Sequence, residues 1–457
     1  MKVRPFWVRV FAGALFLGIA GVGGWLLTPP PSPGSSASSA GPAPPSLLVE
    51  GESVVGEDLT EGEATAWNNA AKLAVDPRGG LHVVYQYAYG KRGDPDRMRY
   101  ARSGDGRRWE IEEWTGRYPA IAADGEGRVY IAYVERTSEA DRLWLRVQDF
   151  EGEGRGTRWL VDEGPRRTRA YPALLSGEGR LLLAWEVHEP GAGVHRIRFA
   201  EISREGEIAK ETVVEGERGV FFPTLATDRS GRIYLAWQAT EDARRYRIEV
   251  AVREEEGGWR FLGRVAGKNG DGRSPTLTSL TPDEGEGAAL AFVSLGPDRE
   301  SALYRVTLRE GRLEPPEEIA QGPLPTEAEA EAESGGGRTA ENATGRVPVG
   351  YGWASRAPAP SVADYARELV AFPTEAEGLV IWGHTVPNAC GIGPLWWAWK
   401  GRVQGELFGA FASYPNLQPD PQEEGVYHLV WSDRVADELR AFEVRYARLR
   451  IDLDPDP

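Results

Sequence analysis

The feature of this sequence that most constrains its fold is a phrase that recurs about seven times along the chain. Each copy consists of an apolar strand, a tight polar turn and a second strand that ends in an aromatic residue. The clearest copies are Tyr118–Glu135, Tyr171–Val187 and Phe222–Gln238. Looser copies run over Ala70–Gln86, Ser274–Phe292, Pro360–Trp382 and Tyr414–Trp431. Recurrence of this kind indicates a repeat architecture.

The spacing of the copies identifies the repeat. The opening prolines Pro119, Pro172, Pro223 and Pro275 are 53, 51 and 52 residues apart. Each copy is followed by two more segments in which apolar and polar residues alternate, which indicates half-buried antiparallel strands. Four strands in roughly 50 residues make one blade of a β-propeller. The sequence therefore predicts an all-β, seven-bladed β-propeller, with six or eight blades as alternatives if a looser copy has been misassigned.

The two ends of the predicted ring match each other. Leu47–Val54 precedes the first copy and is similar to the fourth-strand segment Thr212–Gly219. The last unit ends after its third strand, Phe442–Ile451. We therefore expect the N-terminal strand to complete the last blade, which removes an exposed sheet edge. The propeller is predicted to span residues 47–453.

Composition restricts the class of protein. The single cysteine, Cys390, excludes an internal disulfide, so the ring must close by strand pairing and packing. Of the 53 basic residues six are lysine, which leaves 47 arginines (53 − 6), and only two residues are methionine. This profile is typical of a thermophile, although a GC-rich genome produces the same arginine bias. The net charge of −16 argues against a nucleic-acid partner.

The N-terminus predicts a membrane address. Three basic residues precede the uncharged run Val10–Leu27, whose 18 residues are enough to span a bilayer. We expect residues 1–27 to be an uncleaved single-pass anchor and the Pro/Ser-rich residues 28–46 to be a linker. Basic residues before the span place the propeller on the extracytoplasmic side of the cell membrane. The alternative is a signal peptide cleaved near Ala40, which would give a secreted or periplasmic protein.

A second irregular segment lies within the propeller. Residues 323–346 are acidic, small and rich in glycine, and they offer no apolar surface to bury. This composition predicts a disordered insertion between blades.

A hairpin of the first blade resembles a known motif. Ser103, Asp105, Gly106 and Trp109 resemble the Asp-box, S-x-D-x-G-x-x-W, of the sialidase and BNR-repeat families, shortened by one residue. The resemblance implies the same propeller fold and a structural role, in which Asp and Ser bind turn amides while Trp packs between blades. The chain carries one clear copy of the motif, whereas sialidases usually carry several.

Arginines before the opening prolines provide a second resemblance. Sialidases open their first blade with [FY]-R-[IL]-P, and the arginine of that phrase binds the substrate carboxylate. Arg117, Arg273 and Arg356 lie two places before a proline, and Arg169 lies three places before Pro172. The resemblance implies that these arginines bind a carboxylate. However, glycine replaces the aromatic residue before Arg117 and Arg273, and none of the arginines belongs to the first blade.

Propeller topology predicts where these arginines meet. The loops from fourth to first strands and from second to third strands share one rim, and the Asp-box hairpin lies on the opposite face. The candidate ligand-binding residues on that rim are Arg117, Arg169, Arg273, Arg356, Glu186 and His384. Arginines suit the bidentate capture of a carboxylate. The alternative is that they form ion pairs with neighbouring acids.

Catalytic residues cannot be assigned from the sequence. A sialidase-like enzyme needs an arginine cluster, a tyrosine activated by a glutamate, and an aspartate, and no spacing singles these out. The five histidines do not cluster at metal-ligand spacing, so we expect no metal and no cofactor. His82 and His428 occupy equivalent places in second strands, which favours a packing role. We therefore favour a non-catalytic binding or assembly module for a glycan, an acidic ligand or an envelope protein, with a sialidase-like exo-glycoside hydrolase as the alternative.

Overall fold

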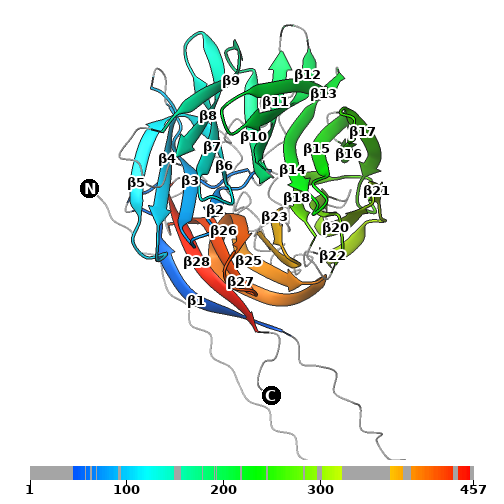
Figure 1. The fold of residues 1–457 in the computed structure, drawn as a ribbon. Helices are drawn as coiled ribbons and strands as arrows, with labels where there is room; N and C mark the ends of the chain where they lie inside the picture. The colour runs from blue at the N-terminus through cyan, green and yellow to red at the C-terminus, as the bar shows by residue number, and fades with distance from the viewer. Residues whose placement is uncertain are drawn as a thin grey trace, which may run out of the picture. The chain divides into compact units, whose positions relative to one another are not determined.

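The strands form seven blades arranged around a central axis (Figure 1). The structure is a computed structural model that describes residues 45–452, except for 322–370, 384–392 and several segments of seven residues or fewer. The predicted anchor (residues 1–27), the predicted insertion (residues 323–346), Arg356 and His384 lie outside the described residues. In the part of the chain that is described, no helix has the length and hydrophobicity needed to cross a membrane. The prediction of a seven-bladed, all-β propeller is confirmed.

In the first four blades the strands pair in chain order, each antiparallel to the next. Blade 1 consists of β2 (Leu73–Val75), β3 (Leu81–Ala88), β4 (Arg97–Ser103) and β5 (Glu110–Thr115). Blade 2 consists of β6 (Arg117–Ala123), β7 (Val129–Arg136), β8 (Ala140–Gln148) and β9 (Arg158–Pro165). Blade 3 consists of β10 (Arg169–Gly177), β11 (Arg180–Glu189), β12 (Val194–Ser203) and β13 (Ile208–Gly216). Blade 4 consists of β14 (Val220–Thr227), β15 (Ile233–Asp242), β16 (Arg245–Arg253) and β17 (Trp259–Val265). Blade 5 consists of β18 (Arg273–Ser279), β19 (Ala288–Leu295) and β20 (Ser301–Arg309), with β21 (Arg312–Leu313) and β22 (Glu317–Gln321) both paired to β20.

Blades 6 and 7 share one long strand. Blade 6 contains β23 (Ala371–Ala376), β24 (Leu379–Gly383) and β25 (Gly393–Trp399), and blade 7 contains β27 (Val426–Arg434) and β28 (Phe442–Asp452). The 18 residues of β26 (Arg402–Pro419) pair with β25 as far as Ala412 and with β27 from Ala412 onward. No loop therefore separates these two blades.

The ring closes as the sequence predicts. The N-terminal strand β1 (Ser46–Val54) pairs antiparallel with β28, from Ser46 against Asp452 to Val54 against Arg445. The first strand of the propeller is thus the outermost strand of its last blade. Figure 1 shows β1 (blue) lying alongside β28 (red).

A bulge interrupts the first strand of blades 2 to 7 at the opening proline. Proline has no N–H to give to the strand ladder, so the register shifts there. The residue before the proline has a positive φ at Tyr118 (54°), Tyr171 (49°), Phe222 (52°), Ser274 (51°) and Tyr414 (50°). In blade 6 the bulge falls at Pro373, so the assignment of Pro360 as the opening proline is wrong.

The segment Ala64–Lys72, called the axial segment from here on, crosses the axis before blade 1; its residue 68 is not among those described. Its side chains donate to carbonyl oxygens of the bulges: Thr65 Oγ1 to Tyr414 (3.0 Å), Asn69 Nδ2 to Tyr171 (3.1 Å) and Pro223 (3.0 Å), and Lys72 Nζ to Pro119 (2.7 Å). These carbonyls belong to blades 7, 3, 4 and 2. Buried carbonyls outside the strand ladder need other donors, and the axial segment supplies them.

The aromatic residue that ends each copy of the repeated phrase packs between blades. These side chains are all 2% exposed or less: Tyr85, Tyr133, Trp185, Trp237, Phe292, Trp382 and Trp431. The Trp396–Trp399 run lies in β25, the third strand of its blade. Large aromatic side chains bury enough apolar area to hold neighbouring blades together without disulfides.

His82 and His428 are part of buried polar networks at equivalent places in blades 1 and 7. His82 bonds Asp76 (3.1 Å) and the Tyr100 hydroxyl (2.8 Å). His428 bonds Asp420 (3.0 Å) and Tyr446 (2.7 Å) in the same way. Burial opposes ionisation of Asp76, but hydrogen bonds from His82 and from backbone amides outweigh it and lower the pKa of this carboxyl. Both histidines are therefore structural.

Candidate functional site

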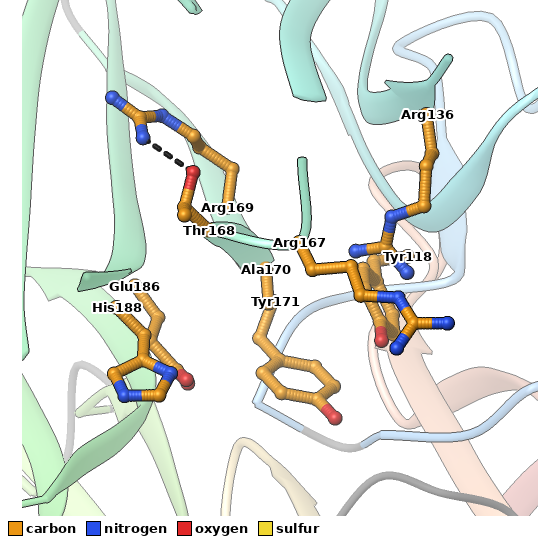
Figure 2. Close-up of a pocket in the computed structure, with 9 residues that line it drawn as sticks. All are labelled: Tyr118, Arg136, Arg167, Thr168, Arg169, Ala170, Tyr171, Glu186 and His188. Atoms are coloured by element: carbon orange, nitrogen blue, oxygen red, sulfur yellow. Dashed lines mark hydrogen bonds between the residues drawn. The ribbon is translucent and has the colours of Figure 1, made fainter. Parts of the chain in front are cut away.

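A small pocket opens on the predicted rim, over blades 2 and 3 (Figure 2). Its lining residues come from the starts of β6 and β10, the ends of β7 and β11, and the β9–β10 connection. They are Tyr118, Arg136, Arg167, Thr168, Arg169, Ala170, Tyr171, Glu186 and His188. The pocket has room for little more than a water molecule, so a larger ligand must displace its outer side chains.

Two bulge tyrosines lie side by side in the wall of the pocket. The rings of Tyr118 and Tyr171 are 4.5 Å apart between centroids, and both residues have a positive φ. The Arg117 guanidinium covers the Tyr118 ring at 4.1 Å and donates to its hydroxyl at 2.5 Å. Arg117 therefore supports the pocket from outside its lining.

A buried aspartate of blade 2 holds the loop of blade 3 that lines the pocket. Asp141 is fully buried and receives a bidentate contact from Arg136, with Nε–Oδ1 at 2.9 Å and Nη2–Oδ2 at 3.0 Å. It also accepts the backbone N–H of Thr168 at 2.9 Å. Burial opposes ionisation of Asp141, but Arg136 outweighs it and lowers the pKa of this carboxyl. Asp141 thus fixes both Arg136 and the loop as an ionised group.

Glu186 is the most unusual residue of the pocket. Its side chain is 3% exposed, it accepts the backbone N–H of Phe222, and its Oε2 has no hydrogen-bond partner. Burial raises the pKa of Glu186 to about 8. The carboxyl is therefore mostly protonated at pH 7. Figure 2 shows Glu186 and His188 projecting from β11 on one side of Tyr171, with Arg136, Arg167 and Tyr118 on the other.

The other titratable groups nearby are also shifted toward their neutral forms. Burial, followed by the charges of Tyr118 and Glu186, raises the pKa of Tyr171 well above its ordinary value. His188 stacks on His195 with centroids 4.1 Å apart, and burial lowers the pKa of both imidazoles, that of His195 to about 4. At pH 7 the pocket combines neutral acid, imidazole and phenol groups with guanidinium cations.

Of the three rim arginines that the structure describes, Arg169 lines the pocket and Arg117 and Arg273 do not. Arg169 lines the pocket but is 7% exposed, and its three nitrogens donate to Asp162 (3.1 Å), Thr168 (2.6 Å) and the Glu163 carbonyl (2.9 Å). Arg117 pairs with Asp96 at 3.3 Å. Arg273 pairs with Asp271 at 2.9 Å in blade 5 and is not among the pocket residues. These pairs match the ion-pair alternative for the rim arginines.

Of the pocket residues, Arg169 and Glu186 are among the candidates predicted from the sequence, whereas Tyr118, Tyr171, Arg136 and Arg167 are not. A signal for the tyrosines was present, because both stand immediately before an opening proline. The position of Arg136 depends on Asp141 across a turn, which no repeat pattern indicates.

The Asp-box residues lie in the β4–β5 turn, away from the pocket. Ser103 Oγ accepts the Gly106 N–H (2.9 Å), and Asp105 Oδ1 accepts those of Arg107 (2.8 Å) and Arg108 (2.9 Å). Trp109 Nε1 donates to Ser53 Oγ of β1 at 3.2 Å, and its ring packs edge-on against Tyr446 of β28. The turn thus fastens blade 1 to the two strands that close the ring.

Among the residues that the structure describes, no three His, Cys, Asp or Glu side chains are grouped so as to hold a metal ion.

Comparison with known proteins identifies the architecture. No protein-family model matches the sequence, and no curated protein is similar to it in sequence. The polysaccharide lyase Uly1 is similar in structure, with a TM-score of 0.50, 10% identity, and coverage of 88% of this chain and 100% of the lyase. The α-L-arabinofuranosidase Arb93A from Fusarium graminearum gives a TM-score of 0.46 at 10% identity, covering 86% of this chain and 98% of that one.

The β-propeller domain of the Trilobed protease from Pyrococcus furiosus is also similar, with a TM-score of 0.43, 12% identity, and coverage of 83% of this chain and 93% of that chain. At such identities a likeness carries information about the fold alone. What the comparisons establish is that this chain has the β-propeller fold.

Proposed function

We propose that this protein is a membrane-anchored, extracytoplasmic β-propeller that binds a carboxylate-bearing glycan at the rim pocket of blades 2 and 3, without catalysing a reaction. The observation that carries the proposal is the grouping of the Tyr118 and Tyr171 side chains with the Arg136 and Arg167 side chains beside a buried carboxyl with an unpartnered oxygen. Guanidinium groups bind carboxylates with defined geometry, and tyrosines bind sugar rings and hydroxyls.

The charge of the pocket supports an anionic ligand. Three lining residues are arginines, and the one lining acid, Glu186, is mostly neutral at pH 7. Asp141 and Asp162 balance Arg136 and Arg169 from behind. The side chain of Arg167 is exposed, so it can reach an incoming anion. A polysaccharide lyase is among the proteins with this fold, which supports sugars as the ligand class, and the pocket arginines favour acidic ones.

The address of the protein supports the same proposal. The run Val10–Leu27 has the length of a membrane span, and the Pro/Ser-rich linker separates it from the first strand of the propeller. A propeller held outside the cytoplasm meets polysaccharides and envelope proteins. Fractionation of cells that express the full chain tests the address, because recovery in the cytoplasmic fraction contradicts it.

Binding is tested by calorimetry with D-glucuronate, N-acetylneuraminate and D-glucose. We expect the acidic sugars to bind and glucose to bind much more weakly. Arg167→Ala should weaken binding by about 1.5–3 kcal/mol, the range for a charge-assisted hydrogen bond. Arg166→Ala is the matched control, because Arg166 is an exposed neighbour that does not line the pocket. Equal affinity for acidic and neutral sugars would contradict an anion site.

A sialidase-like exo-glycoside hydrolase is the second candidate, favoured by one specific observation. Tyr171 and Glu186 are buried close enough for the Glu186 charge to affect the pKa of Tyr171, and arginines line the same pocket. The resemblance to sialidases implies a tyrosine activated by a glutamate. Turnover of a fluorogenic sialoside by the wild-type chain, abolished in Tyr171→Phe, would establish this candidate over the binding module.

A further inference from the structure

The equivalent position in the next blade can be compared directly with Glu186. In second strands, Glu186 and Gln238 both follow the buried aromatic residue, in blades 3 and 4. Gln238 Oε1 accepts the N–H of Ser274, the residue before the opening proline of blade 5, at 3.1 Å. Glu186 accepts the N–H of Phe222, the residue before the opening proline of blade 4. The two side chains therefore make the same contact with the next blade.

Gln238 shows that a glutamine is sufficient for that structural contact. Gln86 occupies the same place in blade 1 and is held by different contacts, in which its Nε2 donates to three backbone carbonyls at 2.8–3.3 Å. A glutamate there must be buried as a carboxyl, which costs free energy unless the group remains protonated. Blade 3, which contributes most of the pocket lining, has glutamate at this place, and the Oε2 that the contact does not use is buried without a partner. A purely structural role does not account for that choice.

We propose that Glu186 acts in the pocket as a carboxylic acid that donates a hydrogen bond to the ligand carboxylate, so that ligand binding is coupled to retention of one proton. The inference rests on the proposed function, because it assigns the acidic ligand of that same pocket a partner on β11. An O–H···O⁻ bond between a carboxylic acid and a carboxylate is charge-assisted and short. Once ionised, Glu186 would repel the ligand instead.

The groups that face Glu186 suit this role. The charged and titratable groups that line the pocket together with Glu186 come from its own strand, from β6, β7 and β10, and from the β9–β10 connection: His188, Tyr118, Arg136, Arg169, Tyr171 and Arg167. His195 on β12 stands behind His188. None of them is an acid, and the nearby Asp141 and Asp162 are ion-paired. A ligand carboxylate therefore meets no uncompensated negative charge as long as Glu186 keeps its proton.

The coupling fixes the sign of the pH dependence. Below the pKa of Glu186 the acid is present and affinity is independent of this group. Above that pKa each pH unit should lower the affinity by about tenfold, because one proton must be taken up for each ligand bound. Glu186→Gln retains an N–H donor and the backbone contact but has no proton to lose, so its affinity should not change over the same range.

The experiment measures the affinity of the full chain for D-glucuronate and N-acetylneuraminate by calorimetry from pH 5.5 to 9.5, in wild type, Glu186→Gln and Gln238→Glu. The infrared difference spectrum of wild type against Glu186→Gln follows the carboxyl directly and needs no ligand. We expect a protonated carboxyl at pH 7, affinity that falls in alkali for wild type, and no such fall for Glu186→Gln. Gln238→Glu places a buried carboxyl outside the pocket and should leave the wild-type pH profile of binding unchanged.

The outcomes separate the two claims. If wild type binds both sugars and Glu186→Gln has the same pH profile, the role of Glu186 is overturned while the binding function stands. A Glu186 carboxyl that is ionised at pH 7 in the infrared spectrum also overturns it. If wild type binds neither acidic sugar at any pH, both the proposed function and the role of Glu186 are overturned. Thermal unfolding of Glu186→Gln confirms that any change in binding is not caused by misfolding.

Discussion

At the scale of single residues, Lys72 gives the sharpest prediction. Its ammonium group is completely buried among the bulge carbonyls, where Nζ donates to Pro119 O at 2.7 Å and Ala70 O at 3.4 Å. Burial lowers the pKa of Lys72 from 10.5 to about 7. Between pH 7 and 10.5 the unfolded chain therefore holds a proton that the folded chain does not, so stability rises with pH over this window.

Lys72→Met removes that titration. The difference in unfolding free energy between wild type and Lys72→Met should shift in favour of wild type by about 1.4 kcal/mol per pH unit from pH 7 toward pH 10. Urea unfolding at pH 6, 8 and 10 measures it. Parallel stability curves for the two proteins would show that Lys72 keeps its charge in the axial segment.

At the scale of elements, the β4–β5 turn is predicted to stabilise ring closure. Trp109 reaches Ser53 of β1 and Tyr446 of β28, so its loss should loosen the contact between blade 1 and blade 7. Trp109→Ala should lower the unfolding free energy by about 3 kcal/mol, the scale for truncating a packed aromatic side chain. Arg107→Ala, in the same turn but exposed, serves as the control and should change stability by less than about 0.5 kcal/mol. Thermal unfolding distinguishes them, and equal losses would contradict the role of the turn.

Elements also show which parts of the molecule a sequence can predict. Strands of the repeated phrase were predictable because alternation and turn residues are local signals. The sequence pattern places the opening proline of blade 6 at Pro360, whereas the bulge lies at Pro373, because strand pairing rather than local pattern determines where a bulge falls. The continuous strand β26 was missed for the same reason, since no turn marks the change of blade.

The candidate site was predictable only in part. Topology identified the rim that gathers Arg169 and Glu186. Whether an arginine forms an ion pair depends on its neighbours in space, as Arg169 and Asp162 show. The environment of Glu186 likewise includes the backbone N–H of Phe222, which belongs to the next blade.

At the scale of the whole molecule, stability is predicted to depend on β1. Deleting residues 1–54 removes the outer strand of blade 7 and exposes β28 as an unpaired edge, which favours aggregation. We expect this truncation to be insoluble or strongly destabilised. Deleting residues 1–44 leaves every strand pair of β1 in place and should yield a folded monomer, as measured by size-exclusion chromatography and thermal unfolding. A stable monomer from the chain that lacks residues 1–54 would mean that the propeller folds without β1.

The pairing of β1 with β28 also has a consequence for biosynthesis. Synthesis runs from the N-terminus, so β1 emerges first, yet its partner residues, such as Asp452 opposite Ser46, are among the last to be made. Throughout translation the growing chain therefore carries two unsatisfied sheet edges, one at each end. Contacts of such long sequence separation also form slowly. The open form, with its exposed edges, exists between translation and closure, so a cell that produces this protein quickly should accumulate it.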